Sequence, residues 1–309
     1  MRNIYLHPKL KEAKQRGIHL IASDIDWTLR DPSDPRYELD AVQSLICRIK
    51  KSGLQVMLLT GRDASLRRDF LPGLISQMNK HKIESPIYFG CANGISLYQV
   101  NGRNITTIYE NDLTFRDIQK CLTVISLVQK KHKLRLEDYQ NRAVDVFQKF
   151  LSSVWKDILP QRYIALAKKL GGTIFVESSK ISLALPKNTS VQRSYISTIK
   201  RKIGPSFTLK GDQEFAHISR AYVDGKNSKA DKLFALNFVC DKLNINLDQV
   251  AVFGGALDEI DRRMLKHCKY GFTNQQEYKS TNDKTPPFKL SGNVSPVALV
   301  HKAINYLIS

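Results

Sequence analysis

The chain holds 309 residues, enough for two domains, since one domain usually has about 100–200 residues. Hydrophobic residues make up 42% and charged residues 25%, a balance that supports a packed core and excludes global disorder. No stretch approaches the roughly 18 apolar residues of a membrane span, and the N-terminal segment lacks the apolar region of a secretory signal. We therefore expect a soluble, cytoplasmic protein with no membrane partner.

The net charge of +19 is the one unusual feature of the composition. It is compatible with a nucleic-acid partner, an anionic substrate or a solvated lysine-rich surface. Because the basic residues are spread along the chain, we favour the solvated surface and keep nucleic acid as an alternative. The five cysteines are scattered without zinc-type spacing, which indicates reduced thiols in a reducing compartment.

The N-terminal third alternates strand and helix patterns. A short apolar run at 18–23 predicts a buried strand that ends in a polar cluster. Apolar residues at helical spacing follow over 39–49, and a second buried strand over 54–60 also ends in a polar turn. This order of elements predicts an α/β fold with a Rossmann-like parallel sheet.

The pattern changes near residue 95 and returns near residue 217. Two alternating segments flank Asn101 and Gly102, a β-hairpin signature, and a mixture of helices and short strands follows. An amphipathic helix over 228–243, a buried strand over 249–255 and a final helix over 295–308 then resume the first pattern. We therefore expect a core domain of residues 1–94 and 217–309 around an inserted α+β cap domain of residues 95–216.

Polar side chains follow the two N-terminal strands where each one ends. Asp24 and Asp26 stand two residues apart and point the same way if the chain stays extended. Such a pair suits a nucleophile beside a general acid/base, or a magnesium site. Thr60 offers a hydroxyl and a nearby amide to a phosphate oxygen, whereas Arg62, after Gly61, is either structural or phosphate-facing.

The C-terminal elements supply further charged residues. Lys229 lies at a helix start capped by Asn227 or Ser228, where its charge could balance a phosphoryl group and a carboxylate. The last buried strand is followed by acids that are either first-turn residues complementing a helix dipole or metal ligands: Asp258, Glu259 and Asp261.

Four motifs in this order resemble the haloacid dehalogenase superfamily, and within it the Cof-type (IIB) phosphatases. They are DIDWTL at 24–29, LLTGR at 58–62, SKADKLFAL at 228–236 and VAVFGGALDEIDRRML at 250–265. The segment FGCANGISL also resembles the stretch that leads into the cap in this subgroup. One such motif is weak, whereas four in order around an insert of this size are specific.

The resemblance implies a phosphatase of a small phosphorylated metabolite, with a sugar phosphate as the family-level substrate class. Asp24 would form an aspartyl-phosphate, and Asp26 would protonate the leaving alcohol and then activate water. The residues implied to hold the phosphoryl group are Thr28, Thr60 with its neighbours Gly61 and Arg62, and Lys229.

The resemblance also implies a bound Mg²⁺ ion. Its ligands would be Asp24, the Asp26 carbonyl and an acidic fourth-motif residue, Asp258 or Asp261. Gly255 occupies the position of the first fourth-motif aspartate, which is normally a metal ligand. This departure leaves open a catalytically impaired family member that binds a phosphorylated ligand or a partner protein.

A second departure lies beside the nucleophile. Trp27 stands where the family usually has glycine, so a bulky aromatic side chain either narrows the pocket or stacks on a substrate ring. The sequence does not determine the oligomeric state.

Overall fold

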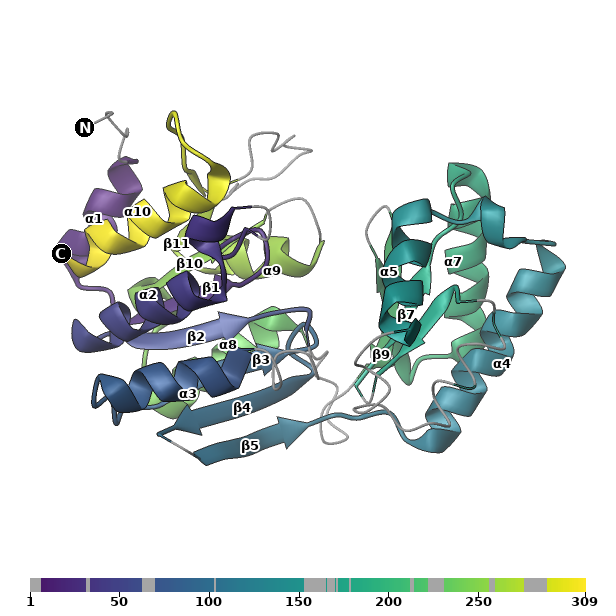
Figure 1. The fold of residues 1–309 in the computed structure, drawn as a ribbon, viewed down its shortest axis with the longest axis horizontal. Coiled ribbons are helices and arrows are strands. Elements are labelled where there is room, and N and C mark those ends of the chain that lie inside the picture. Colours follow the sequence, from purple (N-terminus) through teal and green to yellow (C-terminus); the bar gives the residue numbers. More distant parts are fainter. Residues whose placement is uncertain are drawn as a thin grey trace. The chain divides into compact units, whose positions relative to one another are not determined.

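The computed structural model describes residues 7–31, 34–62, 70–102, 104–152, 165, 170, 172–177, 179–211, 214–221, 231–255, 259–274 and 288–309. The chain forms two compact units, which are drawn in Figure 1 and described separately below. The first unit comprises Met1–Tyr109 and Asp231–Ser309, and the second comprises Glu110–Ala230.

The first unit is built on one eight-stranded sheet. Its strand order is β12-β11-β10-β1-β2-β3-β4-β5, and the first six strands in this order are parallel. β4 is antiparallel to β3, and β5 completes the edge. The strands are β1 (Leu20–Asp24), β2 (Gln55–Leu59), β3 (Ile87–Cys91), β4 (Ser96–Asn101), β5 (Asn104–Glu110), β10 (Val250–Gly254), β11 (Tyr270–Thr273) and β12 (Phe288–Lys289).

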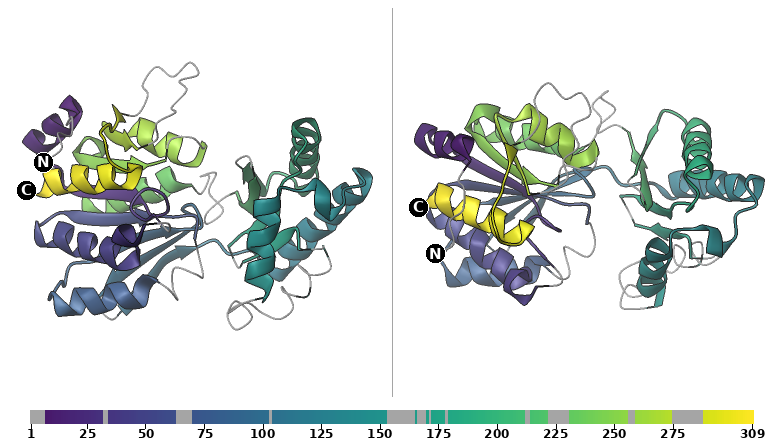
Figure 2. Two further views of the ribbon diagram at one scale, coloured as in Figure 1. Left: turned by 45° about the horizontal axis from the view of Figure 1, so that its top comes forward. Right: turned by 90° about the horizontal axis from the view of Figure 1, so that it is seen from above.

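Helices cover both faces of this sheet, as the views in Figure 2 show. On one face α10 packs against α2, and α2 against α3, whereas α8 and α9 contact each other on the opposite face. The helices are α1 (Pro8–Arg16), α2 (Leu39–Lys51), α3 (Leu71–Lys80), α8 (Lys232–Leu243), α9 (Glu259–His267) and α10 (Pro296–Ile308), with short 3₁₀ turns η1 (Pro35–Tyr37) and η5 (Leu247–Gln249). The predicted α/β fold with a Rossmann-like parallel sheet is confirmed.

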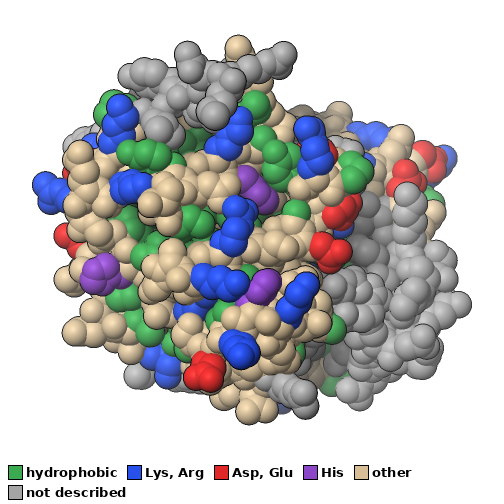
Figure 3. Space-filling view, turned by 60° about the vertical axis from the view of Figure 1, so that its left-hand side comes forward, with side chains coloured by type: hydrophobic (Ala, Val, Ile, Leu, Met, Phe, Trp, Pro, Cys, Tyr) green, Lys and Arg blue, Asp and Glu red, His purple; other side chains and the backbone are tan. Residues whose placement is uncertain are grey.

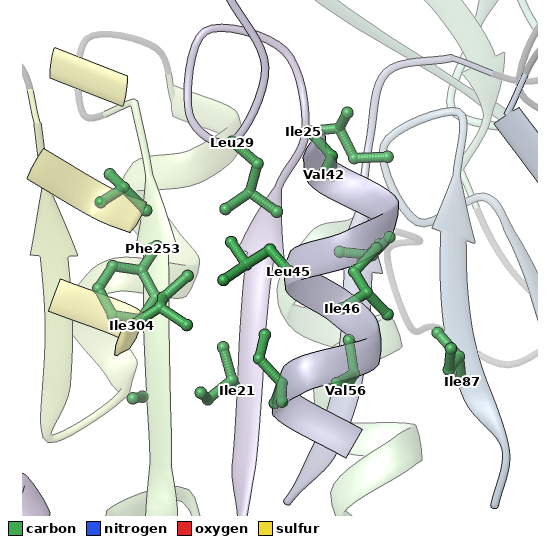
Figure 4. Close-up of a cluster of buried hydrophobic side chains, with 14 of the residues drawn as sticks. Ile21, Ile25, Leu29, Val42, Leu45, Ile46, Val56, Ile87, Phe253 and Ile304 are labelled. Atoms are coloured by element: carbon green, nitrogen blue, oxygen red, sulfur yellow. The ribbon is translucent and has the colours of Figure 1, made fainter. Parts of the chain in front are cut away.

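The core of this unit lies between the sheet and the layer of α2 and α10. The strands β1, β2 and β10 are nearly continuous apolar runs because both of their faces are covered. Figure 4 shows side chains of the strands meeting those of the two helices: Ile21, Ile25, Leu29, Val42, Leu45, Ile46, Val56, Ile87, Phe253 and Ile304. This packing fixes the strands whose ends carry the predicted site residues.

The second unit is an antiparallel sheet with helices. Its strands follow the order β6-β7-β9-β8, and α4 and α7 pack together over one face of the sheet. Phe147 of α5 contacts Phe175 and Phe215, which places α5 on the other face. The elements are α4 (Phe115–Lys131), η3 (Leu136–Asp138), α5 (Asn141–Ser152), β6 (Ile174–Val176), β7 (Ile181–Ala184), α7 (Thr189–Ile203), β8 (Phe207–Gly211) and β9 (Phe215–Arg220).

The units differ from the expected domains at both junctions. The predicted hairpin around Gly102 exists, but β4 pairs with β3 and so extends the sheet of the first unit. At the other junction β9 pairs with β7 and β8, so residues 217–220 belong to the second unit. Alternation of apolar residues predicts a strand, but it does not say which sheet the strand joins.

The first unit is held together at the point where the second unit is inserted. Tyr109, its last residue on the way out, packs edge-on against Phe234 and Phe238 of α8, with ring centroids 5.7 and 5.5 Å apart. Its hydroxyl donates a hydrogen bond to the Gly94 carbonyl over 2.9 Å. The first unit resumes at Asp231 and α8 begins at Lys232, so Tyr109 contacts the first helix after the insertion.

The surface does not gather its positive charge in one block on the face that Figure 3 shows. Lys and Arg side chains are scattered there among polar and apolar residues. Among the helices of the described residues, none has the length and apolar character needed to cross a membrane.

Candidate active site

The carboxyl ends of three parallel strands meet at one edge of the large sheet. β1 lies between β2 and β10, and Asp24 at the end of β1 is paired with Leu59 at the end of β2. Ser23 is paired with Phe253, so β10 ends at a similar level. Residues that follow these strands are therefore neighbours, at the edge where open parallel sheets carry their sites.

Three charged side chains from separate segments converge at this edge. Lys232 Nζ donates to Asp24 Oδ1 over 2.7 Å and to Asp261 Oδ1 over 2.6 Å. The side chains of Lys232 and Asp261 are 4% and 5% exposed, and that of Asp24 is 12% exposed. Two carboxylates thus face one ammonium group, and the cluster carries a net negative charge when all three groups are ionised.

Burial controls the ionisation of this cluster. Removal from water raises the pKa of Asp24 to about 7; Lys232 opposes this shift, and Asp261 adds to it. Burial disfavours the charged form of Lys232, but the two carboxylates outweigh it and raise the pKa of the ammonium group above its ordinary value. Only the ionised carboxylate is a nucleophile, and the contact with the Lys232 ammonium group favours this form of Asp24 against the effect of burial.

The turn that follows β3 fixes the position where α8 begins. Asp231 caps the helix by accepting a hydrogen bond from the Phe234 amide over 2.9 Å, and Arg263 pairs with the same carboxylate. Gly94 lies against the Asp231 backbone at φ +86°, where an added Cβ would clash with that backbone. The glycine therefore permits the close approach that brings Lys232 to the sheet edge.

The second predicted acid has different partners. Both oxygens of Asp26 accept hydrogen bonds from Arg62, over 2.6 Å from Nε and 2.5 Å from Nη2. Arg30 lies 3.6 Å from Asp26 and also pairs with Glu38. A bidentate arginine fixes the orientation of a carboxylate. Arg62 therefore holds the candidate general acid/base in this structure, and among the described residues Asp24 and Asp26 have different hydrogen-bond partners.

The predicted phosphate-binding hydroxyls are both buried. Thr28 Oγ1 lies 3.4 Å from Asp24 Oδ2 and donates to the candidate nucleophile. Thr60 Oγ1 accepts a hydrogen bond from the Arg62 amide over 3.1 Å, in the turn that contains Gly61 and follows β2. The structure thus brings Thr28 to Asp24 and Thr60 to Arg62.

The donors available to an implied magnesium ion are carboxylate oxygens, the ligand type this ion prefers. Asp24 and Asp261 both present such oxygens at the Lys232 ammonium group. Gly255 adds no side chain, Asp258 lies outside the described residues, and the described residues contain no cluster of three potential metal-binding His, Cys, Asp or Glu side chains. The two carboxylates fit magnesium in donor type and charge, since the ion commonly binds one or two carboxylates and keeps several waters.

Lys232 is a site residue that the sequence analysis does not identify. The sequence pattern points instead to Lys229, which lies outside the described residues. The predicted start of the helix at 228 is wrong, because Asp231 is its N-cap. Asp231 is itself a preferred capping residue, so the sequence contained the signal, but Asn227 and Ser228 are equally good caps by residue type.

Solved structures with the same fold include two phosphatases and a nucleotidase. The superfamily phosphatase BT1666 from Bacteroides thetaiotaomicron covers 94% of this chain and 96% of its own, with TM-score 0.58 and 13% identity. The subclass IIB sugar phosphatase BT4131 covers 93% and 98%, with TM-score 0.55 and 14% identity. A truncated IMP-nucleotidase from Plasmodium falciparum covers 97% and 73%, with TM-score 0.52 and 15% identity. These similarities show the fold alone. One of the three structures, BT4131, belongs to the IIB subgroup that the four motifs resemble.

The sequence itself matches a known family over most of its length. No curated protein sequence matches this chain significantly. The profile of the haloacid dehalogenase-like hydrolases matches residues 21–276, a span that includes the ends of β1, β2 and β10 and the first turns of α8 and α9. The chain therefore belongs to the haloacid dehalogenase-like hydrolase family.

Proposed function

We propose that this chain is a magnesium-dependent phosphomonoesterase that acts through an aspartyl-phosphate on a small phosphorylated metabolite. The observation that carries the proposal is the contact of Lys232 with both Asp24 and Asp261 at the carboxyl edge of the sheet. A carboxylate can approach a phosphate dianion only where positive charge offsets their repulsion. Lys232 supplies such charge directly at the candidate nucleophile.

The proposed reaction has two steps. In the first, an oxygen of Asp24 attacks phosphorus, the bond to the leaving oxygen breaks, and Asp26 gives its proton to that oxygen. In the second, Asp26 takes a proton from water, and the resulting hydroxide attacks phosphorus and displaces Asp24. An alcohol and inorganic phosphate are released, and both carboxyl groups return to their starting state.

The cationic side chains have distinct roles in this scheme. Lys232 keeps Asp24 in place and faces the phosphoryl oxygens, and a divalent cation, when bound, would supply further positive charge against the same oxygens. Arg62 orients Asp26, but Asp26 must gain a proton during the cycle, so their bidentate pair has to loosen. Arg62 is then free to face the phosphate, which reconciles its structural and phosphate-facing roles.

The substrate class is the least constrained part of the proposal. A sugar phosphate is the class that the family resemblance implies. The structures with this fold include a sugar phosphatase and an IMP-nucleotidase, so the fold by itself leaves the leaving group open.

Gly255 favours a second candidate function. Without a carboxylate at this position, the chain could bind a phosphorylated ligand or a partner protein with little or no turnover. A Gly255→Asp variant that gains magnesium-dependent activity over a weak wild type would support this candidate. A wild type that is already fast would exclude it.

Hydrolysis of an aryl phosphate tests the leading proposal. We expect turnover with Mg²⁺, little turnover in excess EDTA, and none by Asp24→Asn. Asp241→Asn removes an exposed acid from α8 and serves as the matched control that stays active. Turnover that persists in Asp24→Asn would exclude the aspartyl-phosphate, and a wild type inactive on a broad panel of phosphate esters would favour the ligand-binding candidate.

A further inference from the structure

The loop that follows β1 presents one large aromatic side chain to solvent, between the candidate acid Asp26 and Thr28. Trp27 is 55% exposed, whereas Thr28 beside it is 1% exposed. Single exposed hydrophobic residues are common on protein surfaces, so exposure alone would mean little. Trp27 differs because it directly follows Asp26 and adopts an unusual backbone conformation.

The backbone of Trp27 is left-handed, with φ +60°. Bulky residues rarely adopt this conformation, which glycine adopts without steric cost. The fold nevertheless holds it firmly: the Trp27 amide donates to the Arg30 carbonyl over 2.8 Å, and the Trp27 carbonyl accepts from Asn274 Nδ2 over 2.9 Å. Asn274 is itself 1% exposed, so this anchor is part of the protein interior.

Glycine would therefore suit the backbone of this position better than tryptophan does. The indole adds little to the core because more than half of its surface faces water. A strained residue with an exposed side chain at a candidate site points to a role in binding. Trp27 offers a rigid, flat, apolar face one residue after the candidate general acid/base.

The polar groups around this loop are already engaged with one another. Asp26 is held by Arg62, Thr28 donates to Asp24, and Asn274 donates to the Trp27 carbonyl. A planar aromatic ring would need only the indole face.

We infer that Trp27 is a specificity residue whose indole stacks on a nucleobase, so that the preferred substrates are nucleoside monophosphates. This inference rests on the proposed phosphatase function and narrows its substrate class. Every nucleobase has a flat face that can stack on an aromatic side chain, so the contact selects for a base without selecting one base over another.

A pair of substrates that differ only in the base provides the first test. Adenosine 5′-monophosphate and ribose 5-phosphate share the sugar and the 5′-phosphate. The ratio of their kcat/KM values should fall about 5- to 150-fold in Trp27→Ala, the range expected for one base stacked on an aromatic residue, and Trp27→Phe should restore most of it. Leu127→Ala, which truncates another hydrophobic residue that is 54% exposed, should leave the ratio unchanged.

An equal loss for both substrates in Trp27→Ala would show that Trp27 contacts the sugar or the phosphate, and would overturn the inference. An unchanged ratio in an active Trp27→Ala variant would overturn it as well. Both results would leave the phosphatase proposal intact.

A binding measurement separates the inference from the catalytic proposal. The chain has two tryptophans, so Trp155→Phe leaves Trp27 as the single reporter, and Asp24→Asn removes the candidate nucleophile. Adenosine 5′-monophosphate should quench the fluorescence of this double variant, whereas ribose 5-phosphate should not. Selective quenching by a chain that hydrolyses no phosphate would support base stacking without catalysis. Hydrolysis of nucleotides by the wild type, without any quenching in the double variant, would refute the stacking.

Discussion

Each of the two units buries charged and polar side chains, but in different parts of the topology. In the first unit, Lys232 joins Asp24 and Asp261 beyond the ends of parallel strands. In the second unit, Ser182 of β7 is paired in register with His217 of β9, and Ser182 Oγ lies 2.9 Å from His217 Nδ1. The first cluster stands where strands have ended, and the second lies within a hydrogen-bonded sheet.

The second unit also buries an ion pair beside this sheet. Lys180 lies 3.3 Å from Glu177, and their side chains are 8% and 7% exposed. This pair has one charge of each sign, whereas the cluster of the first unit has two carboxylates for one ammonium group. Buried charge alone therefore does not indicate a catalytic site. The informative features are the position beyond the strand ends and the unbalanced negative charge, which together suit a cationic ligand.

Loss of the candidate nucleophile gives the largest expected effect on kcat/KM, and it tests directly whether the cluster of the first unit serves catalysis. Asp24→Asn should lower kcat/KM by roughly 10⁴-fold or more. It should leave the free energy of unfolding unchanged or raise it by about 1 kcal/mol, because the buried cluster then has one charge of each sign. Steady-state kinetics and urea unfolding measure the two effects. Loss of stability in step with loss of activity would mean that Asp24 serves the fold.

Removal of the shared cation should affect both properties. Lys232→Met leaves Asp24 and Asp261 facing each other without the ammonium group, so we expect a loss of about 3 kcal/mol in unfolding free energy. The kcat/KM value should also fall by roughly 10²- to 10³-fold, since the charge at the nucleophile is lost. Lys242→Met changes an exposed lysine on the same helix and is the control. Equal behaviour of the two variants would contradict the assignment of Lys232.

Two glycines with the same backbone angle allow the cost of backbone strain to be measured apart from an effect on the position of α8. Gly94 and Gly53 both have φ +86°, but a Cβ on Gly53 meets nothing within 4 Å, whereas one on Gly94 meets the Asp231 backbone. Gly53→Ala should cost only the strain, about 1–2 kcal/mol of unfolding free energy. Gly94→Ala should cost about 1–3 kcal/mol more and should also lower kcat, because it displaces the start of α8. If Gly94→Ala retained full kcat, this turn would not position Lys232.

The smallest expected effect on activity concerns the cluster of the second unit. Burial, and then the nearby Lys180, lower the pKa of His217 to about 3. Between about pH 6.5 and pH 3 only the unfolded chain takes up this proton, so the stabilising contribution is present above pH 6.5 and is lost as the pH falls. The destabilisation caused by His217→Gln should therefore shrink by up to about 1.4 kcal/mol per pH unit in that interval.

Unfolding curves of wild type and His217→Gln between pH 7 and pH 4 would measure this change. His19→Gln, at an exposed position, controls for the loss of an imidazole. A constant difference across this pH range would show that the folded chain does not keep the His217 ring neutral. If His217→Gln lost much of its activity toward a small aryl phosphate at pH 7, the cluster of the second unit would also serve catalysis, and the two clusters would no longer differ in role.

The sequence was sufficient for the parts of the site that depend on local pattern. Asp24 could be placed because an apolar run of strand length ends at it. Asp261 was one of the acids that follow the last buried strand, and the sequence did not choose between it and Asp258. Lys232 could not be distinguished from Lys229, since several capping residues stand in a row and the difference of three residues is decided by packing against Gly94.

Pairings between distant segments were beyond a local reading. The hydrogen bonds from Arg62 to Asp26 join residues that are 36 positions apart, and they depend on how the neighbouring strands β1 and β2 end. The assignment of β4 and β5 to the large sheet likewise depends on pairing with β3, which the hairpin pattern cannot specify. The order of the motifs was enough to predict the family because it combines many weak local signals. An individual contact between distant residues is known only once the chain is folded.

The anchoring of Tyr109 against α8 has a consequence for how this protein could be re-engineered. Because Tyr109 contacts α8, the two points of the first unit between which residues 110–230 are inserted lie close together. The entropy of closing a loop grows only slowly with its length, so such a junction tolerates inserts of very different sizes. A short flexible linker in place of residues 110–230 would span the junction, and another domain could be transplanted there without redesign of the sheet.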